Sequence, residues 1–193
     1  MEAQEESYDK LWPILTALTV CLGSLAFGTG LGYPSPSMPN LNDNPNPFHI
    51  NAEQTSWVSG IMSLGALMGS LVGGPFMDKF GRKLGLMYAS VPFAISWVIV
   101  AASPNFACLL LGQALLGFCM GIFCVICPVY IGEISPAAIR GVLGSCHQLA
   151  ACLGLLFVYG CGAVLTWSWL AIACEALILV MIAVLAFIPE SPR

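Results

Sequence analysis

Six of the charged residues in the body of this chain form two clusters. Asp78, Lys79, Arg82 and Lys83 form the first, and Glu133 and Arg140 form the second. Each cluster mixes an acid with bases, and a carboxylate facing a guanidinium can accept two parallel hydrogen bonds from it. We therefore predict that the two clusters face each other as a network of ion pairs, held by the ends of neighbouring helices.

Long stretches almost free of charge must supply those helices: 11–33, 54–77, 84–132 and 141–189. With 58% hydrophobic and only 8% charged residues, the chain is not a soluble domain, in which charged residues make up about 25%. A helix rises 1.5 Å per residue, so about 20 apolar residues cross a hydrocarbon core about 30 Å thick. The last two stretches are long enough for two crossings each, with turn signals at Pro104 and Gly162. We predict an all-α membrane protein of six helices, near 11–33, 55–77, 84–103, 107–131, 142–163 and 167–188.

The basic residues indicate how these helices are oriented. All six of them fall on one side of the membrane if six helices alternate in direction: Lys10, Lys79, Arg82, Lys83, Arg140 and Arg193. By the positive-inside rule this side is the cytoplasm. We therefore predict that both termini are cytoplasmic, with residues 1–10 disordered and 190–193 a short cytoplasmic end. The segment Pro34–Glu53 is expected outside, where its prolines favour extended or turn structure over a continuing helix.

Glycines recur at four-residue spacing in two predicted helices. Gly65, Gly69 and Gly73 lie in one, and Gly117 and Gly121 lie in another. Helices in a bilayer associate where small residues allow their backbones to approach closely. We predict tight helix packing at these glycines. The alternative is that they leave room for a ligand or for helices to slide.

Few other residues could carry chemistry. Gln148 and Glu175 lie in the last apolar stretch, where a polar side chain usually faces the helix bundle or a transport pathway. Cys124 and Cys127 form a CxxC pair, but no second pair accompanies it, so no zinc site is predicted. No cofactor and no nucleic-acid partner is expected.

Three motifs resemble those of one transporter family. Residues 74–83 are similar to the GxxxDRxGRR motif of the major facilitator superfamily. Residues 128–141 resemble the PVYxxExxPxxxRG signature of its sugar porters, and Pro189–Arg193 matches their PESPR. The resemblance covers the chain from its first helix onward and points to insect facilitated trehalose and glucose transporters. It implies the N-terminal half of a major facilitator fold, which is a 3+3 inverted repeat.

The resemblance also implies a cytoplasmic latch. In such porters these motifs form ion pairs that hold the outward-open state. The residues carried over to this role are Asp78, Lys79, Arg82, Lys83, Glu133, Arg140, Glu190 and Arg193. Two positions depart from the family. Lys79 replaces an arginine and loses its bidentate geometry, and Gln113 stands where the GRxxxG motif has an arginine.

A sugar site is implied in the same way. Gln148 matches the glutamine of the family's HQL motif, which contacts hexose. Ala151, Cys152 and Leu155 follow on its helical face, and Thr29 in the first helix completes the expected set of binding residues. An interhelical hydrogen bond is the alternative role for Gln148. His147 is expected to face away and to be structural.

The first helix bears on ion coupling. Proton-coupled sugar porters carry an acidic residue there, and residues 11–33 contain none, which favours facilitated diffusion. Glu175 is the exception that needs explaining. It is either a protonated acid bonded to a neighbouring helix or a residue of proton coupling or gating.

These features lead to competing functional hypotheses. The first is a sugar facilitator of the plasma membrane that works by alternating access, present here as the N-terminal half or a truncated form and lacking a second six-helix half or partner chain. The second is a non-transporting truncated isoform that pairs with or regulates a full-length carrier. An intramembrane enzyme is disfavoured, because no GxSG serine, HExxH or pair of membrane aspartates occurs.

Overall fold

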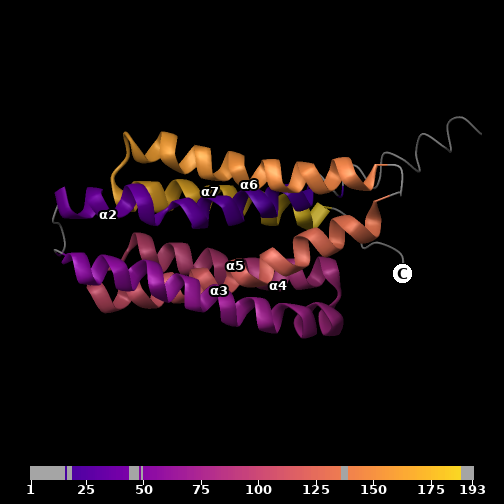
Figure 1. Cartoon of the computed structure of the whole chain (residues 1–193), viewed down its shortest axis with the longest axis horizontal. Coiled ribbons are helices and arrows are strands. Elements are labelled where there is room, and N and C mark those ends of the chain that lie inside the picture. Colours follow the sequence, from indigo (N-terminus) through magenta and orange to yellow (C-terminus); the bar gives the residue numbers. More distant parts are fainter. Residues whose placement is uncertain (1–15, 17–18, 44–47, 49, 136–138, 188–193) are drawn as a thin grey trace, which may run out of the picture.

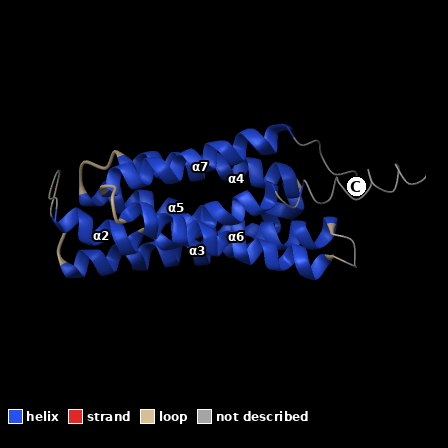
Figure 2. Cartoon of the chain, turned by 90° about the horizontal axis from the view of Figure 1, so that it is seen from above, coloured by secondary structure: helices blue, strands red, loops and turns tan. Residues whose placement is uncertain are grey.

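A computed structural model describes residues 16, 19–43, 48, 50–135 and 139–187. After helical residues 19–32, the elements are α2 (Pro34–Asp43), α3 (Ala52–Phe80), α4 (Arg82–Ala101), α5 (Phe106–Ile134), α6 (Arg140–Gly162) and α7 (Trp167–Phe187). The helices run side by side along the long axis of the molecule (Figure 1). This described part contains helices and no strand (Figure 2), and α3 to α7 are each long and apolar enough to cross a membrane. The predicted all-α membrane fold is confirmed, whereas residues 1–10 and 190–193 lie outside the described part.

The segment after the first helix differs from the prediction. Its prolines were expected to prevent a helix, but α2 is helical from Pro34 to Asp43. A single turn residue, Tyr33, separates α2 from the helix before it, and the Tyr33 amide still donates to the carbonyl oxygen of Thr29 at 3.0 Å. Proline is tolerated in the first turn of a helix because the N–H groups there need no partner within the helix. Pro34 and Pro36 fall in the first turn of α2, so the helix can form despite them.

The connections between helices lie at two opposite ends of the bundle. The α3–α4 and α5–α6 links are at the end where the C-terminus is marked, and the α2–α3 and α6–α7 links are at the other (Figure 1). The α3–α4 link turns at Gly81, whose φ of 82° is easily adopted only by glycine. The two charge clusters of the sequence therefore lie at the same end of the bundle.

The glycines of α3 and α5 bring these two helices into backbone contact. A Cβ atom added at Gly69 would lie 1.9 Å from the carbonyl oxygen of Phe118. One added at Gly117 would lie 2.1 Å from the carbonyl oxygen of Met62. Neither distance is compatible with a side chain, so the predicted tight packing is confirmed at this crossing and there is no room for a ligand.

A second backbone crossing joins the first helix to α6. A Cβ at Gly28 would lie 2.0 Å from the carbonyl oxygen of Ala151, and one at Gly154 would lie 2.1 Å from that of Leu25. Glycine thus sets the spacing of two separate helix pairs. Close approach of this kind replaces hydrophobic burial as the source of association in lipid.

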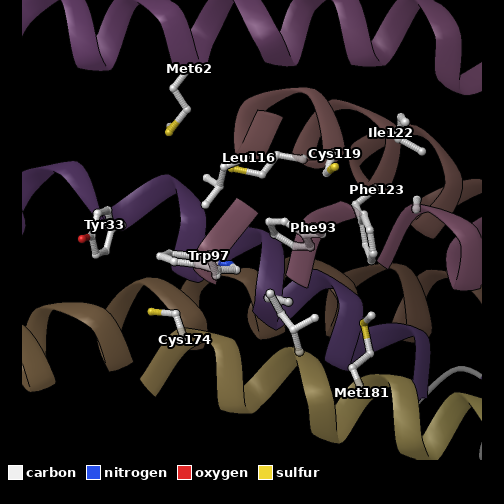
Figure 3. Close-up of a cluster of buried hydrophobic side chains, with 14 of the residues drawn as sticks. Tyr33, Met62, Phe93, Trp97, Leu116, Cys119, Ile122, Phe123, Cys174 and Met181 are labelled. Carbon is white, nitrogen blue, oxygen red and sulfur yellow. The ribbon is translucent and has the colours of Figure 1, made fainter. Parts of the chain in front are cut away.

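The remaining helices fill the space between these crossings with large side chains. Trp97 of α4 is fully buried and meets the Tyr33 ring edge-on, with the ring centres 5.0 Å apart. Figure 3 shows both rings in the cluster, with Phe93, Phe123 and Met181 nearby. The Tyr33 hydroxyl donates to the carbonyl oxygen of Trp167 at 3.0 Å and so anchors the start of α7.

The bundle has two unlike flanks. Figure 2 shows α4 and α7 along one flank and α3 and α6 along the opposite one. Exposed residues on the α3 and α6 flank include the polar residues Ser56, Ser59, Ser63, Ser145 and Gln148. On α4 and α7, every exposed residue whose side chain is described is apolar. The α4 and α7 flank therefore suits lipid, whereas the α3 and α6 flank carries polar residues among its exposed apolar ones.

Candidate functional site

An ion pair joins the two charge clusters. Arg82 begins α4 directly after the Gly81 turn, and Glu133 lies in the last turn of α5. The Arg82 side chain donates from both Nε and a terminal nitrogen to the two carboxylate oxygens of Glu133, each at 2.7 Å. The two planar groups thus form the two-pronged pair that is strongest between these side chains.

The other expected latch residues lie around this pair with different contacts. Arg140 donates to the carbonyl oxygen of Ser135 at 3.4 Å, across the α5–α6 link. Asp78 and Lys79 are exposed at the end of α3, and the Lys79 amine lies 5.6 Å from the centre of the Phe80 ring. Glu190 and Arg193 fall outside the described residues. Arg82 and Glu133 are therefore the core of the network as far as the structure describes it.

The exposure of the Arg82–Glu133 pair limits what it can contribute. Its side chains are 34% and 45% exposed. Ion pairs open to solvent stabilise a conformation by about 0.2 to 1 kcal/mol. If this pair is part of the latch that the resemblance implies, Glu133→Gln in a complete carrier should shift the ratio of outward-open to inward-open forms by at most about fivefold and lower uptake. Reactivity of a cysteine placed at the end of the bundle that carries this pair, measured together with sugar uptake, checks this.

Glu53 gives a matched control for that experiment. It is exposed in the first turn of α3, at the other end of the bundle. Glu53→Gln removes the same charge and should leave both measurements at their wild-type values. Unchanged accessibility and uptake in Glu133→Gln would contradict a role for this pair in holding one conformation.

The expected sugar-binding residues divide into an exposed pair and a buried pair. Gln148 and Cys152 lie one helical turn apart on the exposed face of α6, with Leu155 half-buried beside them. Thr29 and Ala151 do not share this face. Thr29 is fully buried and its hydroxyl donates to the carbonyl oxygen of Ala26 at 2.7 Å. Ala151 is 7% exposed, because its backbone lies against Gly28 at the close crossing.

Gln148 itself bonds to no other described residue. The interhelical hydrogen bond that was its alternative role is therefore absent from the described part of the chain. Its neighbour His147 does make such a bond. The His147 Nδ1 and the Ser24 hydroxyl form a hydrogen bond between α6 and the first helix, as suits a structural residue facing away from Gln148. No sequence pattern indicated the Ser24 contact.

Glu175 and Gln113 have buried polar atoms without a hydrogen-bond partner among the described residues. Glu175 of α7 lines a cavity with Trp97 of α4, and its Oε2 has no hydrogen-bond partner among the described residues. The protonated acid bonded to a neighbouring helix, expected as one alternative, is not seen at that oxygen. Gln113, in the position of the family's arginine, is fully buried, and its amide nitrogen and oxygen are likewise unpaired within the described chain.

Comparison with protein families and curated proteins gives consistent results. A family model described as "Sugar (and other) transporter" matches residues 7–193. The solute carrier family 2 facilitated glucose transporter member 6 of Mus musculus is 41% identical over 180 residues, which are 93% of this chain and 36% of that protein. The facilitated trehalose transporter Tret1 of Drosophila grimshawi is 38% identical over 181 residues, 93% of this chain and 20% of that protein.

Solved structures give the same picture of the fold. The inward-open xylose transporter XylE from E. coli superposes with a TM-score of 0.82 at 25% sequence identity. The match covers 94% of this chain and 49% of that one. The chain therefore spans less than half the length of the similar proteins named above.

Proposed function

The chain belongs to the sugar transporter family, and from this premise we propose that it forms the first six-helix half of a carrier that moves a sugar across the membrane by facilitated diffusion. The observation that carries the proposal is the exposed amide of Gln148 on the polar flank of an otherwise apolar bundle. An amide can donate to one sugar hydroxyl and accept from another. Exposed Cys152 and half-buried Leu155 add an apolar wall beside it.

The carrier's substrate site is proposed to lie against this flank. Carriers of the major facilitator type bind substrate between two six-helix halves and expose it alternately to each side as the halves rock. Gln148 then faces a second half, supplied by more of the same chain or by a partner chain. Thr29 and Ala151 act in this proposal as packing residues that fix the position of α6.

The Arg82–Glu133 pair fits the same mechanism. It ties the start of α4 to the end of α5 at the end of the bundle that carries the basic residues. We propose that this end is cytoplasmic in a plasma-membrane protein and that the pair stabilises the form closed to the cytoplasm. Exposure of the pair keeps its contribution small enough for each transport cycle to reverse it.

The substrate class is proposed to be a hexose or trehalose. Relatives similar to this chain are named for glucose and for trehalose. Facilitated diffusion is supported by the first helix, which has no acid between residues 11 and 33 to carry a proton. Glu175 belongs to α7 and Gln148 to α6, and these helices lie on opposite flanks of the bundle (Figure 2), so the proposal gives Glu175 no coupling role.

Proteoliposomes test the proposal. A complete carrier containing this chain should take up radiolabelled glucose or trehalose saturably and stop at equal concentrations inside and outside. An imposed pH gradient should leave that end point unchanged. The isolated 193-residue chain should show no saturable uptake, because one half has no partner to rock against. Accumulation driven by the pH gradient would refute facilitated diffusion, and uptake by the isolated chain would refute the two-half mechanism.

A further inference from the structure

The first helix and α6 touch again one helical turn before their backbones cross. At the crossing, Gly28 lies against the carbonyl oxygen of Ala151. Four residues earlier on both helices, the hydroxyl of Ser24 is hydrogen-bonded to Nδ1 of His147. Four residues span about 6 Å along a helix. The crossing holds α6 at one level, and the hydrogen bond adds a second contact that restrains the tilt and rotation of the turn around His147.

Close packing on this face of α6 stops after the crossing. A Cβ atom added at Gly144, one turn before His147 on the same face, would meet no described atom within 4 Å. A Cβ at Gly154, one turn beyond Ala151, would by contrast lie 2.1 Å from a carbonyl oxygen of the first helix. Within the described part of the chain, the His147 side chain therefore bridges a wider space, where backbone contact no longer joins the two helices.

Ser24 is a well-placed partner for this bridge. Its side chain is fully buried in the first helix. Its Oγ also lies 3.3 Å from the carbonyl oxygen of Val20, which is longer than the usual 2.5 to 3.0 Å of a hydroxyl hydrogen bond. His147 is thus the closer partner. A hydroxyl can donate to an unprotonated ring nitrogen or accept from a protonated one, so the pair can bond in either tautomer of His147.

The restrained turn is the one that presents Gln148. This residue follows His147 and lies about 100° further around the helix axis. Gln148 is exposed, whereas His147 is half-buried against the first helix. A tilt or rotation of this turn moves both side chains together, because the backbone of the helix fixes the direction of each Cβ. A binding group must be held within about 0.5 Å of its working position.

We propose that His147 is a positioning residue for the sugar site, and that its hydrogen bond to Ser24 holds the turn of α6 that presents the Gln148 amide to the sugar. This inference rests on the proposed function, in which Gln148 contacts the sugar. In this role His147 does not touch the sugar, and its Nδ1 is engaged on the side of the first helix. Ser24 thereby influences sugar binding although it is fully buried.

Sugar affinity tests the proposal, with glucose and trehalose each titrated by calorimetry into the purified complete carrier. Ser24→Ala and His147→Leu remove the same hydrogen bond from its two ends. Each should weaken affinity about fivefold, and the double variant should be no weaker than His147→Leu alone, because one interaction is lost. His147→Asn keeps a polar atom near the place of Nδ1 and should stay within about twofold of the wild-type affinity.

Ser96 provides the matched control for Ser24. It is equally buried, and its hydroxyl donates to the carbonyl oxygen of Phe93 within α4 at 2.6 Å. Ser96→Ala should change sugar affinity by no more than about twofold. The elution profile of each purified variant separates a loss of binding from a loss of folded protein. If His147→Leu does not fold, Ser24→Ala is the smaller change and decides the question.

A Gln148→Ala background shows whether His147 acts through Gln148. His147→Leu should cause no further loss of affinity there, because the amide that it positions is gone. A further fivefold loss would mean that His147 acts independently, and would overturn the positioning role. So would wild-type affinity in both Ser24→Ala and His147→Leu, and the proposed function would then stand if Gln148→Ala still weakens binding. No binding of either sugar, or no effect of Gln148→Ala, would instead refute the proposed sugar contact and this inference with it.

Discussion

Replacing Gly69 by alanine is expected to remove most of the folded carrier from the membrane. The new Cβ atom would lie 1.9 Å from the carbonyl oxygen of Phe118, a main-chain atom that cannot rotate away. Overpacking against side chains lowers the free energy of unfolding by about 1 to 3 kcal/mol. A clash with the backbone of a neighbouring helix should lower it by at least the larger of these values. A loss of that size is a large fraction of a total stability of about 5 to 15 kcal/mol. Surface abundance and the elution profile of a fluorescent fusion measure it.

Gly60 provides the matched control in the same helix. A Cβ added there meets no atom within 4 Å, and alanine favours a helix over glycine by about 1 kcal/mol. Gly60→Ala should therefore leave abundance and elution unchanged. If both variants behave like wild type, the α3–α5 crossing is not set by backbone contact and the packing argument fails.

Gln148→Ala is the second substitution expected to have a large effect, and it should weaken sugar binding without lowering the amount of folded protein. If the amide pairs with sugar hydroxyls, its removal leaves those hydroxyls unpaired in a partly enclosed site and weakens affinity by roughly 1 to 3 kcal/mol, about 5- to 150-fold. Surface abundance should stay normal, because Gln148 is exposed and bonds to no other described residue. Sugar binding to purified complete carrier, measured by tryptophan fluorescence or calorimetry, gives the affinity directly.

Ser145 is the control on the same exposed face. Its hydroxyl already donates to the carbonyl oxygen of Gly141 at 3.0 Å, so Ser145→Ala removes a polar group that is satisfied within its own helix. We expect no more than about a twofold change in affinity. An unchanged affinity in Gln148→Ala would remove this residue from the substrate site and leave the α6 face without its main polar contact.

Patterns with a strong physical cause were readable from the sequence. Long uncharged stretches predicted the helices, because a segment that crosses a bilayer carries few charges. Four-residue glycine spacing predicted tight packing faces on two helices, and the structure shows that these faces meet at the α3–α5 crossing. Opposite charges at helix ends pointed to the Arg82–Glu133 pair. In each case the pattern can be recognised within one segment of the sequence, without knowing which other segments it packs against.

Features that depend on long-range packing were not readable. The helical course of α2 was not predicted: Pro34 and Pro36 fall in its first turn, where a helix needs few amide donors, and Pro39 lies inside the helix. Thr29 and Ala151 carry residue types suited to a sugar site, yet the crossing of the first helix with α6 buries both. Trp97 looked like one more apolar residue, and only the folded chain shows that Trp97 and Glu175 line the same cavity.

The two glycine crossings also set what kind of motion the bundle allows. Side chains can change rotamer and let helices slip gradually, but main chain pressed on main chain has no such freedom. A slip by one residue, about 1.5 Å, would bring a Cβ or a carbonyl into the space that a glycine leaves open. The axial position of α3 relative to α5, and of the first helix relative to α6, is therefore restricted to one register. Any gradual, low-cost movement must occur at surfaces where side chains, not backbones, form the contact.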